Sequence, residues 1–90
     1  MYRPTLPLTM PEAQAALAEG LRAIDAGEVG IDLSDVAAAD SVAVTILLAW
    51  QRAAKARGVS LNFHQPPAAL RSLADLYGVA ELLAFSGERH

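Results

Sequence analysis

The sequence predicts an α/β fold in which helices pack over a small mixed sheet. Short apolar stretches at 30–33 and 59–63 alternate with longer segments of helical periodicity, an order typical of α/β domains. Ninety residues suffice for one modest core. A hydrophobic content of 53% with 19% charged residues excludes a disordered chain. We therefore expect one domain over residues 1–90.

Composition excludes several functional classes. The chain has no cysteine, so it can form neither disulfides nor thiolate metal sites. A net charge of −3 argues against nucleic acid as a partner, because phosphate binding needs a basic face. The proline-rich N-terminus does not resemble a secretory signal, and the uncharged run 41–51 is shorter than the roughly 20 residues of a spanning helix. We expect a soluble protein.

The first 27 residues predict an extended segment and a helix. Pro4 and Pro7 each remove a backbone donor, so residues 2–8 could form an edge strand but not a central one. Thr9 and Glu12 have the spacing of a capping box at a helix N-terminus, and Gly27 is suited to end the helix. The stripe expected to face the core comprises Ala13, Leu17, Leu21 and Ile24.

The next segment predicts a buried strand, Gly30 to Leu33, then a turn and a long helix from Ser41 to Arg57. Its inward stripe comprises Ala43, Ile46, Leu47, Trp50, Ala53 and Ala54. The other face carries Ser41, Val44, Thr45, Leu48, Gln51, Arg52 and Lys55. Apolar Val44 and Leu48 are unusual there. Either both sides of the helix are partly covered, or these two residues form an exposed patch for a partner.

The last third predicts a strand, a helix and a closing segment. Residues 59–63 alternate in polarity like a half-buried strand. Pro66 and Pro67 end it and begin a helix. Its expected inner side comprises Leu70, Leu73, Leu76 and Tyr77. We expect residues 79–85 to close the core as a short turn or helix, with the core spanning about 8–83 and a loose tail at 86–90.

The residues offer little for catalysis. A triad of Ser41, His64 and an aspartate can be written down, but no Gly-x-Ser-x-Gly elbow supports it, and His64 is expected on the outer side of its strand. Asp32, Asp35 and Asp40 flank the strand-to-helix turn and could hold magnesium, although each also suits a turn or cap. No metal-ligand spacing or glycine-rich phosphate loop occurs. We expect no enzyme, cofactor or metal.

Ser41 has two interpretations. As a simple N-cap it would contribute about 1 kcal/mol. Alternatively, its hydroxyl lies at an exposed helix N-terminus, where it could contact a partner or accept a phosphoryl group. The helix dipole would favour a phosphate, whereas Asp40 next to it would oppose one. The residues alone leave both interpretations open.

Several segments resemble STAS domains, which have the SpoIIAA-like α/β fold. They are Ile31-Asp-Leu-Ser-Asp-Val, the Asp40-Ser41 pair, and Val44-Thr-Ile-Leu-Leu continuing to Ala56-Arg-Gly58. Leu70-Arg-Ser-Leu-Ala-Asp-Leu-Tyr-Gly-Val followed by Leu82-Leu83 narrows the resemblance to the MlaB branch, the STAS subunits of Mla-type ABC transporters. The resemblance covers roughly residues 8–83.

The resemblance implies a non-enzymatic cytoplasmic subunit that binds and stabilises or activates the nucleotide-binding (MlaF-like) ATPase of a phospholipid transporter. Such transporters maintain outer-membrane lipid asymmetry in Gram-negative bacteria. The subunit would be peripheral to the inner membrane through this partner, without inserting itself. In this branch a Ser or Thr after the Asp lies at the ATPase contact, which corresponds to Ser41. The contact is expected to include Asp40, Ser41, Val44, Thr45, Leu48 and Arg52.

Two departures from the family pattern matter. Val42 and Ala43 follow Ser41, where STAS motifs commonly carry Ser or Gly and then Gly, so a kinase loop would be crowded. The N-terminus is also expected to lack one full strand that is common in the family. A phospho-switch like that of anti-sigma-factor antagonists, with Ser41 phosphorylated, is therefore the alternative, and a small hydrolase using Ser41 comes third.

Overall fold

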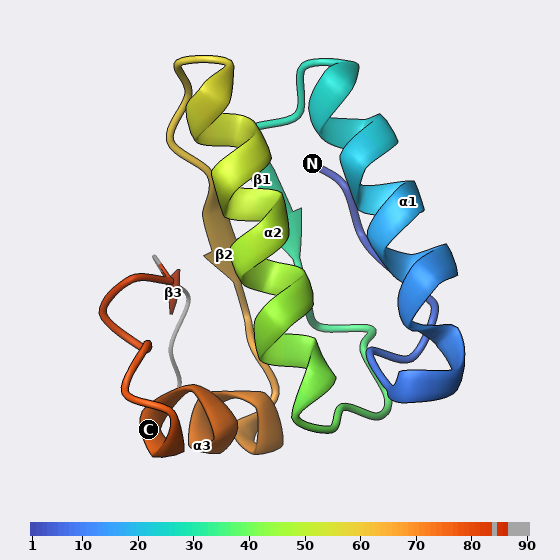
Figure 1. The fold of residues 1–90 in the computed structure, drawn as a ribbon, viewed down its shortest axis with the longest axis vertical. Helices are drawn as coiled ribbons and strands as arrows, with labels where there is room; N and C mark the ends of the chain where they lie inside the picture. Colours follow the sequence, from blue (N-terminus) through green and yellow to red (C-terminus); the bar gives the residue numbers. More distant parts are fainter. Residues whose placement is uncertain (84, 87–90) are drawn as a thin grey trace.

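The computed structural model describes residues 1–83 and 85–86 and arranges them as three helices against a small sheet (Figure 1). Helices α1 and α2 lie side by side along the sheet, and α3 lies below the lower end of α2. The α/β class expected from the sequence is confirmed. In chain order the elements are the 3-10 turn η1 (Met10–Glu12), α1 (Ala13–Asp25), β1 (Gly30–Asp32), α2 (Val42–Ala56), β2 (Asn62–His64), α3 (Ala68–Leu76) and β3 (Phe85–Ser86).

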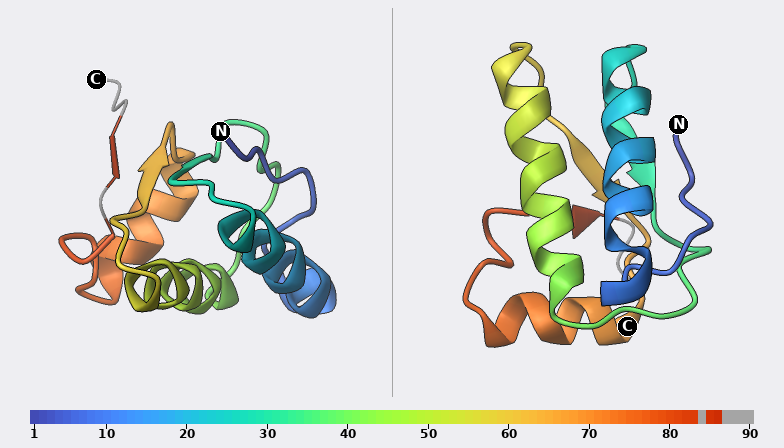
Figure 2. Two further views of the ribbon diagram at one scale, coloured as in Figure 1. Left: turned by 90° about the horizontal axis from the view of Figure 1, so that it is seen from above. Right: turned by 45° about the vertical axis from the view of Figure 1, so that its right-hand side comes forward.

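The three strands pair in the order β1-β2-β3, and both pairings are parallel. A mixed sheet was expected, and this detail is corrected. The reason is the connectivity: α2 links β1 to β2 and α3 lies between β2 and β3, and a helical crossover returns the chain in the same direction. Figure 2 shows α1 and α2 together on one side of the strands.

The N-terminal segment lies along the outer edge of β1, as the edge assignment predicted. The amide of Tyr2 donates to the Gly30 carbonyl (3.1 Å), and the amide of Asp32 donates back to Tyr2 (2.8 Å). Only isolated parallel bridges form, at Tyr2–Ile31 and Leu8–Ala39. Pro4 is fully buried between them. Because proline cannot donate to a ladder, this segment covers the edge without becoming a strand.

The expected capping box at Thr9 is wrong, whereas the helix stop is confirmed. The Thr9 side chain makes no cap hydrogen bond; the Glu12 amide donates to the Thr9 carbonyl and closes η1. The Met10 amide instead donates to the Asp40 carboxylate (3.0 Å), so a residue from the connection between β1 and α2 caps this turn. Gly27 ends α1 with a positive φ of 103°, a conformation that glycine adopts without strain.

The buried stripe of α1 is shifted from the expected one. Ala16, Gly20 and Ile24 face the core, while Leu21 is 36% exposed. Gly20 lies directly against Trp50: a Cβ built on Gly20 would be 2.1 Å from Trp50 Cε2. The indole fills the volume that a larger side chain on α1 would occupy, and this contact sets the rotation of α1.

The inward face of α2 is as expected, since Ala43, Ile46, Leu47, Trp50 and Ala54 are buried and Ala53 is half-buried. The opposite face is partly covered too. Val44 is only 5% exposed, and Leu48 is half-buried against the core. Of the two possibilities for these residues, coverage on both sides of the helix is therefore the correct one.

The C-terminal third requires two corrections. Leu61 and Phe63 point inward as expected. On α3, however, Leu70 and Ala74 are buried, whereas Leu76 and Tyr77 are 75% and 53% exposed. The helix ends at Leu76, and Gly78 turns the chain at φ 70°, so that Leu83 fills the core. Of the expected tail, Ser86 belongs to β3, and residues 87–90 lie outside the described residues.

Within the described residues, no helix combines the length and the apolarity that crossing a membrane requires.

Candidate functional site

Asp40 fixes the N-terminus of α2 to the rest of the molecule. Its Oδ1 accepts the Val42 amide (2.9 Å) and its Oδ2 accepts the Met10 amide (3.0 Å). The Asp40 amide also donates to the Leu8 carbonyl (3.2 Å). One carboxylate therefore caps two helical segments, because the first amides of each lack helical partners. A contact between Asp40 and a partner stays a prediction, and both of its oxygens already have internal donors.

Asp40→Ala is expected to lower the free energy of unfolding by about 2 kcal/mol, because loss of a capping side chain typically costs 0.5–2 kcal/mol and here two amides lose their acceptor. Ser41→Ala is the matched control and should change it by less than about 0.5 kcal/mol. Urea denaturation measures both. Equal stability of the two variants would contradict the capping role of Asp40.

The side chain of Ser41 is free of the N-cap role. Ser41 has helical dihedrals (φ −61°, ψ −22°) and makes no side-chain cap hydrogen bond. It is exposed, and its hydroxyl has no hydrogen bond to any residue in the part of the chain that the structure describes. The simple N-cap interpretation is therefore wrong, and the hydroxyl is available to an external group.

Two adjoining grooves follow the outer face of α2, and Leu48 lines both. The first, of about 370 Å³, is lined by Ser41, Val44, Thr45, Leu48, Tyr77 and Val79. The second, of about 440 Å³, is lined by Leu48, Gln51, Arg52, Lys55, Val59, Ser60, Leu61, Asn62 and Leu82. Five of the six residues expected at the contact thus lie on one continuous surface, and Asp40 does not line it.

The side of this surface that faces α2 is formed by residues that were not expected at the contact. Tyr77, Val79 and Leu82 follow α3 and form the wall opposite α2. Tyr77 is 53% and Leu82 61% exposed, although both would be ordinary core residues by type. Their sequence carries one usable signal, Gly78, which ends the helix and makes the following side chains leave the helical stripe.

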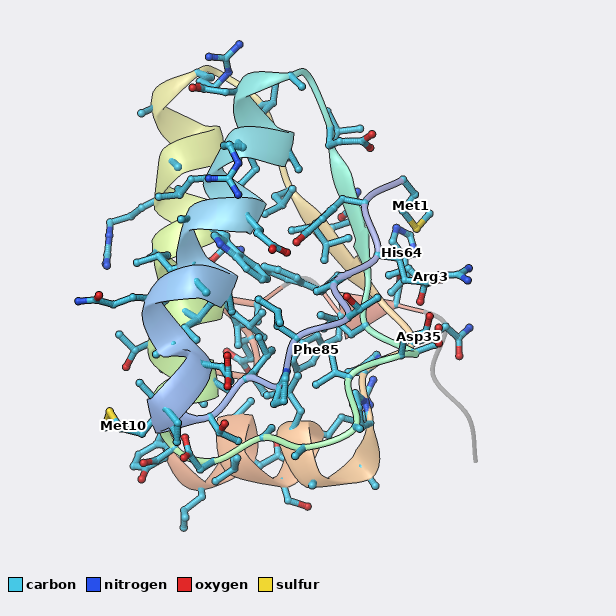
Figure 3. The ribbon with its side chains drawn as sticks, turned by 90° about the vertical axis from the view of Figure 1, so that its right-hand side faces the viewer. Met1, Arg3, Met10, Asp35, His64 and Phe85 are labelled. Carbon is cyan, nitrogen blue, oxygen red and sulfur yellow. The ribbon has the colours of Figure 1, made fainter. Side chains whose placement is uncertain are left out.

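His64 lies on the other side of the sheet from these grooves. Figure 3 shows it on the side away from α1 and α2, the side on which Arg3 and Asp35 also lie. Its Nδ1 is 2.8 Å from the Ser86 hydroxyl. Within the described residues its hydrogen-bond partner is therefore Ser86 and not Ser41, so the triad considered from the sequence is not assembled.

The three aspartates considered for magnesium are held by other groups. Arg3 contacts Asp32 at 3.0 Å and Asp35 at 3.8 Å, whereas Asp40 caps η1 and α2. In the part of the chain that the structure describes, no three acidic or imidazole side chains gather in a metal-binding arrangement. The acids act as turn and cap residues.

Stability should fall at acid pH through Asp32. The backbone amide of Ser34, followed by its side chain and by Arg3, lowers the pKa of this carboxyl below its ordinary 3.8. A carboxyl whose pKa is lower in the folded state than in the unfolded state stabilises the protein at pH values above its unfolded-state pKa. This stabilisation is lost as the pH falls through the folded-state pKa. The free energy of unfolding should therefore decline below about pH 4, as measured by urea denaturation across pH 2–7.

Asp32→Asn should make the free energy of unfolding decline less steeply as the pH falls. Asp75→Asn, at an exposed position, is the control and should keep the wild-type slope. An unchanged slope in Asp32→Asn would show that other carboxyls cause the acid sensitivity.

A family model described as Mlab, STAS domain matches residues 7–84 of the chain. The match spans most of the chain, including α2 and the segment after α3 that line the grooves. Neither a curated protein nor a solved structure gives a significant match.

Proposed function

This chain belongs to the MlaB-type STAS domain family, and on that premise we propose that it is an accessory subunit that binds an ABC-transporter ATPase. Domains of this family are generally non-enzymatic. In the proposed role the chain binds the cytoplasmic, MlaF-like ATPase of a phospholipid-transport complex and stabilises or activates it. It would lie at the inner membrane through this partner, in a complex that maintains outer-membrane lipid asymmetry.

One observation carries the proposal: the free Ser41 hydroxyl lies on a surface where exposed apolar side chains gather. Tyr77 and Leu82 are more than half exposed beside the grooves. Ser41 and Thr45 add exposed hydroxyls to the groove that Tyr77 lines. An aromatic and aliphatic centre with polar groups around it is the usual composition of a protein interface.

The surroundings of Ser41 favour recognition over chemistry. A serine nucleophile needs a base within hydrogen-bond reach, and the imidazole of His64 pairs with Ser86 on the opposite side of the sheet. The Ser41 hydroxyl can still donate one hydrogen bond to a partner and accept up to two from it. Contact without turnover is what a regulatory subunit requires.

The test is reconstitution with the ATPase and permease of the Mla-type transporter from the same organism. The tagged chain should co-elute with the ATPase in size-exclusion chromatography, and its addition should raise the ATPase rate or slow inactivation of the ATPase. Separate elution together with an unchanged rate and an unchanged half-life would contradict the proposal.

A second candidate is a phospho-switch at Ser41, favoured by its exposed hydroxyl at the N-terminus of a long helix. Asp40 weakens this candidate, because its carboxylate already occupies the Val42 amide and would repel a phosphate. Stable phosphate on Ser41 after incubation with a cognate serine kinase, detected by mass spectrometry, would favour the switch. An unmodified Ser41 would exclude that kinase as its regulator.

A further inference from the structure

Two cations on α2 form no ion pair with any residue that the structure describes. The chain has ten acidic and seven basic residues. Ion pairs hold Arg3 to Asp32 and Asp35, and Arg57 to Asp25. Within the described residues, Arg52 and Lys55 form none, although acids outnumber bases. Both are exposed and both line the larger groove.

The lining of this groove is apolar at its base and basic at its rim. Of its apolar lining residues, Leu61 is only 2% exposed, whereas Leu82 is 61% exposed. The Gln51 side-chain amide donates to the Leu82 carbonyl and so ties that wall to α2. Among the described residues, no acidic side chain lines it; the lining comprises Leu48, Gln51, Arg52, Lys55, Val59, Ser60, Leu61, Asn62 and Leu82.

The placement of the two cations is unfavourable for the isolated chain. Residues three positions apart are neighbours on a helix, and like charges there repel. Lys55 is compensated because it lies in the last turn of α2, where the helix dipole favours a cation. Arg52 is a turn earlier and has no such compensation. A carboxylate from outside the chain would offset the repulsion.

We propose that this groove receives a segment of the ATPase in which a carboxylate lies next to an apolar side chain. This inference rests on the proposed function and specifies the chemistry of the partner. The carboxylate pairs with Arg52 and Lys55, and the apolar side chain enters between Leu48 and Leu82. Arginine suits this role because its planar fork can bind a carboxylate through two parallel hydrogen bonds.

The sequence permits an unusually direct test, because Lys55 is its only lysine. A zero-length carbodiimide joins an amine to a carboxylate only when the two are in contact. Treatment of the reconstituted complex should link Lys55 to an aspartate or glutamate of the ATPase, identified by mass spectrometry. Lys55→Arg should retain the complex and lose the cross-link.

Affinity supplies the second measurement. The double variant Arg52→Gln, Lys55→Gln should raise the Kd for the ATPase about tenfold and make it less sensitive to salt. Arg22→Gln, on α1 and outside both grooves, is the matched control and should keep the wild-type Kd.

The two proposals fail in different ways. A stable complex without the Lys55 cross-link, in which the double variant keeps the wild-type Kd, would overturn the acidic-segment inference and leave the ATPase-binding role intact. No complex with any form of the chain would overturn both.

Discussion

Gly20→Ala is expected to lower the free energy of unfolding by about 3 kcal/mol, although alanine is the better helix former. The added Cβ would lie 2.1 Å from Cε2 and 2.2 Å from Nε1 of Trp50, and the fully buried indole has no space into which to retreat. Overpacking of this kind costs about 1–3 kcal/mol. Displacing the ring also breaks the bond from Trp50 Nε1 to the Leu17 carbonyl (3.0 Å).

The loss of that bond would leave a buried N–H without a partner, at a further cost of about 1–3 kcal/mol. The helix propensity of alanine offsets about 1 kcal/mol of the total. Urea denaturation followed by circular dichroism measures the effect. Tryptophan fluorescence supplies a second probe, because Trp50 is the only tryptophan.

A double-mutant cycle isolates the cause. In a Trp50→Phe background the clashing ring atoms are absent, so Gly20→Ala should be close to neutral there. The single change Trp50→Phe destabilises the protein by itself and serves as the reference. Equal losses from Gly20→Ala in both backgrounds would show that the contact between Gly20 and Trp50 does not limit the packing of α1.

This contact also explains where sequence periodicity misplaced α1. The pattern of large apolar residues selected Leu17, Leu21 and Ile24. A glycine has no apolar side chain and so does not contribute to such a pattern. The size of Trp50 on α2 determines that the facing position must have no side chain. Because that partner is 30 positions away, only the tertiary packing reveals that Gly20 is a core residue and Leu21 a surface residue.

The inner face of α2 could be predicted because it depends on helical spacing alone. Its caps could not, since Asp40 and Ser41 are both good capping residues and are adjacent. The choice depends on Met10, whose amide binds the same Asp40 carboxylate from a distant part of the sequence. The use of Asp40 as the cap is what leaves the Ser41 hydroxyl free.

The surface formed by the two grooves could be predicted only in part, for a similar reason. The α2 residues of the grooves share one helix, so their spacing brought them together. Tyr77, Val79 and Leu82 reach the grooves only because the chain turns at Gly78 and runs back beside α2. Apolar residues in a short closing segment are ordinarily buried, and the sequence holds no periodic signal that would indicate their exposure.

Thr45→Arg is expected to weaken ATPase binding by about 30-fold or more, equivalent to about 2 kcal/mol, with the fold unchanged. Thr45 is exposed and lines the groove between Ser41 and Tyr77. An arginine there would fill the groove and place an unmatched charge at the contact. Arginine also has a better helix propensity than threonine, so the free energy of unfolding should stay within about 0.5 kcal/mol of wild type.

Thr45 is a cleaner probe than Leu48, which sequence reasoning would select first. Leu48 is half-buried against the core, so Leu48→Glu would partly bury a carboxylate and weaken fold and contact together. Gln14→Arg, at an exposed position of α1, adds the same charge away from the grooves. It should bind the ATPase with the wild-type Kd in the same calorimetric titration.

Wild-type affinity in Thr45→Arg would exclude the outer face of α2 as the ATPase contact, because no partner could approach Ser41 past an arginine one turn along the helix. Weaker binding in both arginine variants would instead show that the ATPase responds to net charge. The contact is assigned to this groove only if Thr45→Arg loses affinity while Gln14→Arg does not, and if the melting temperatures of the two variants are equal.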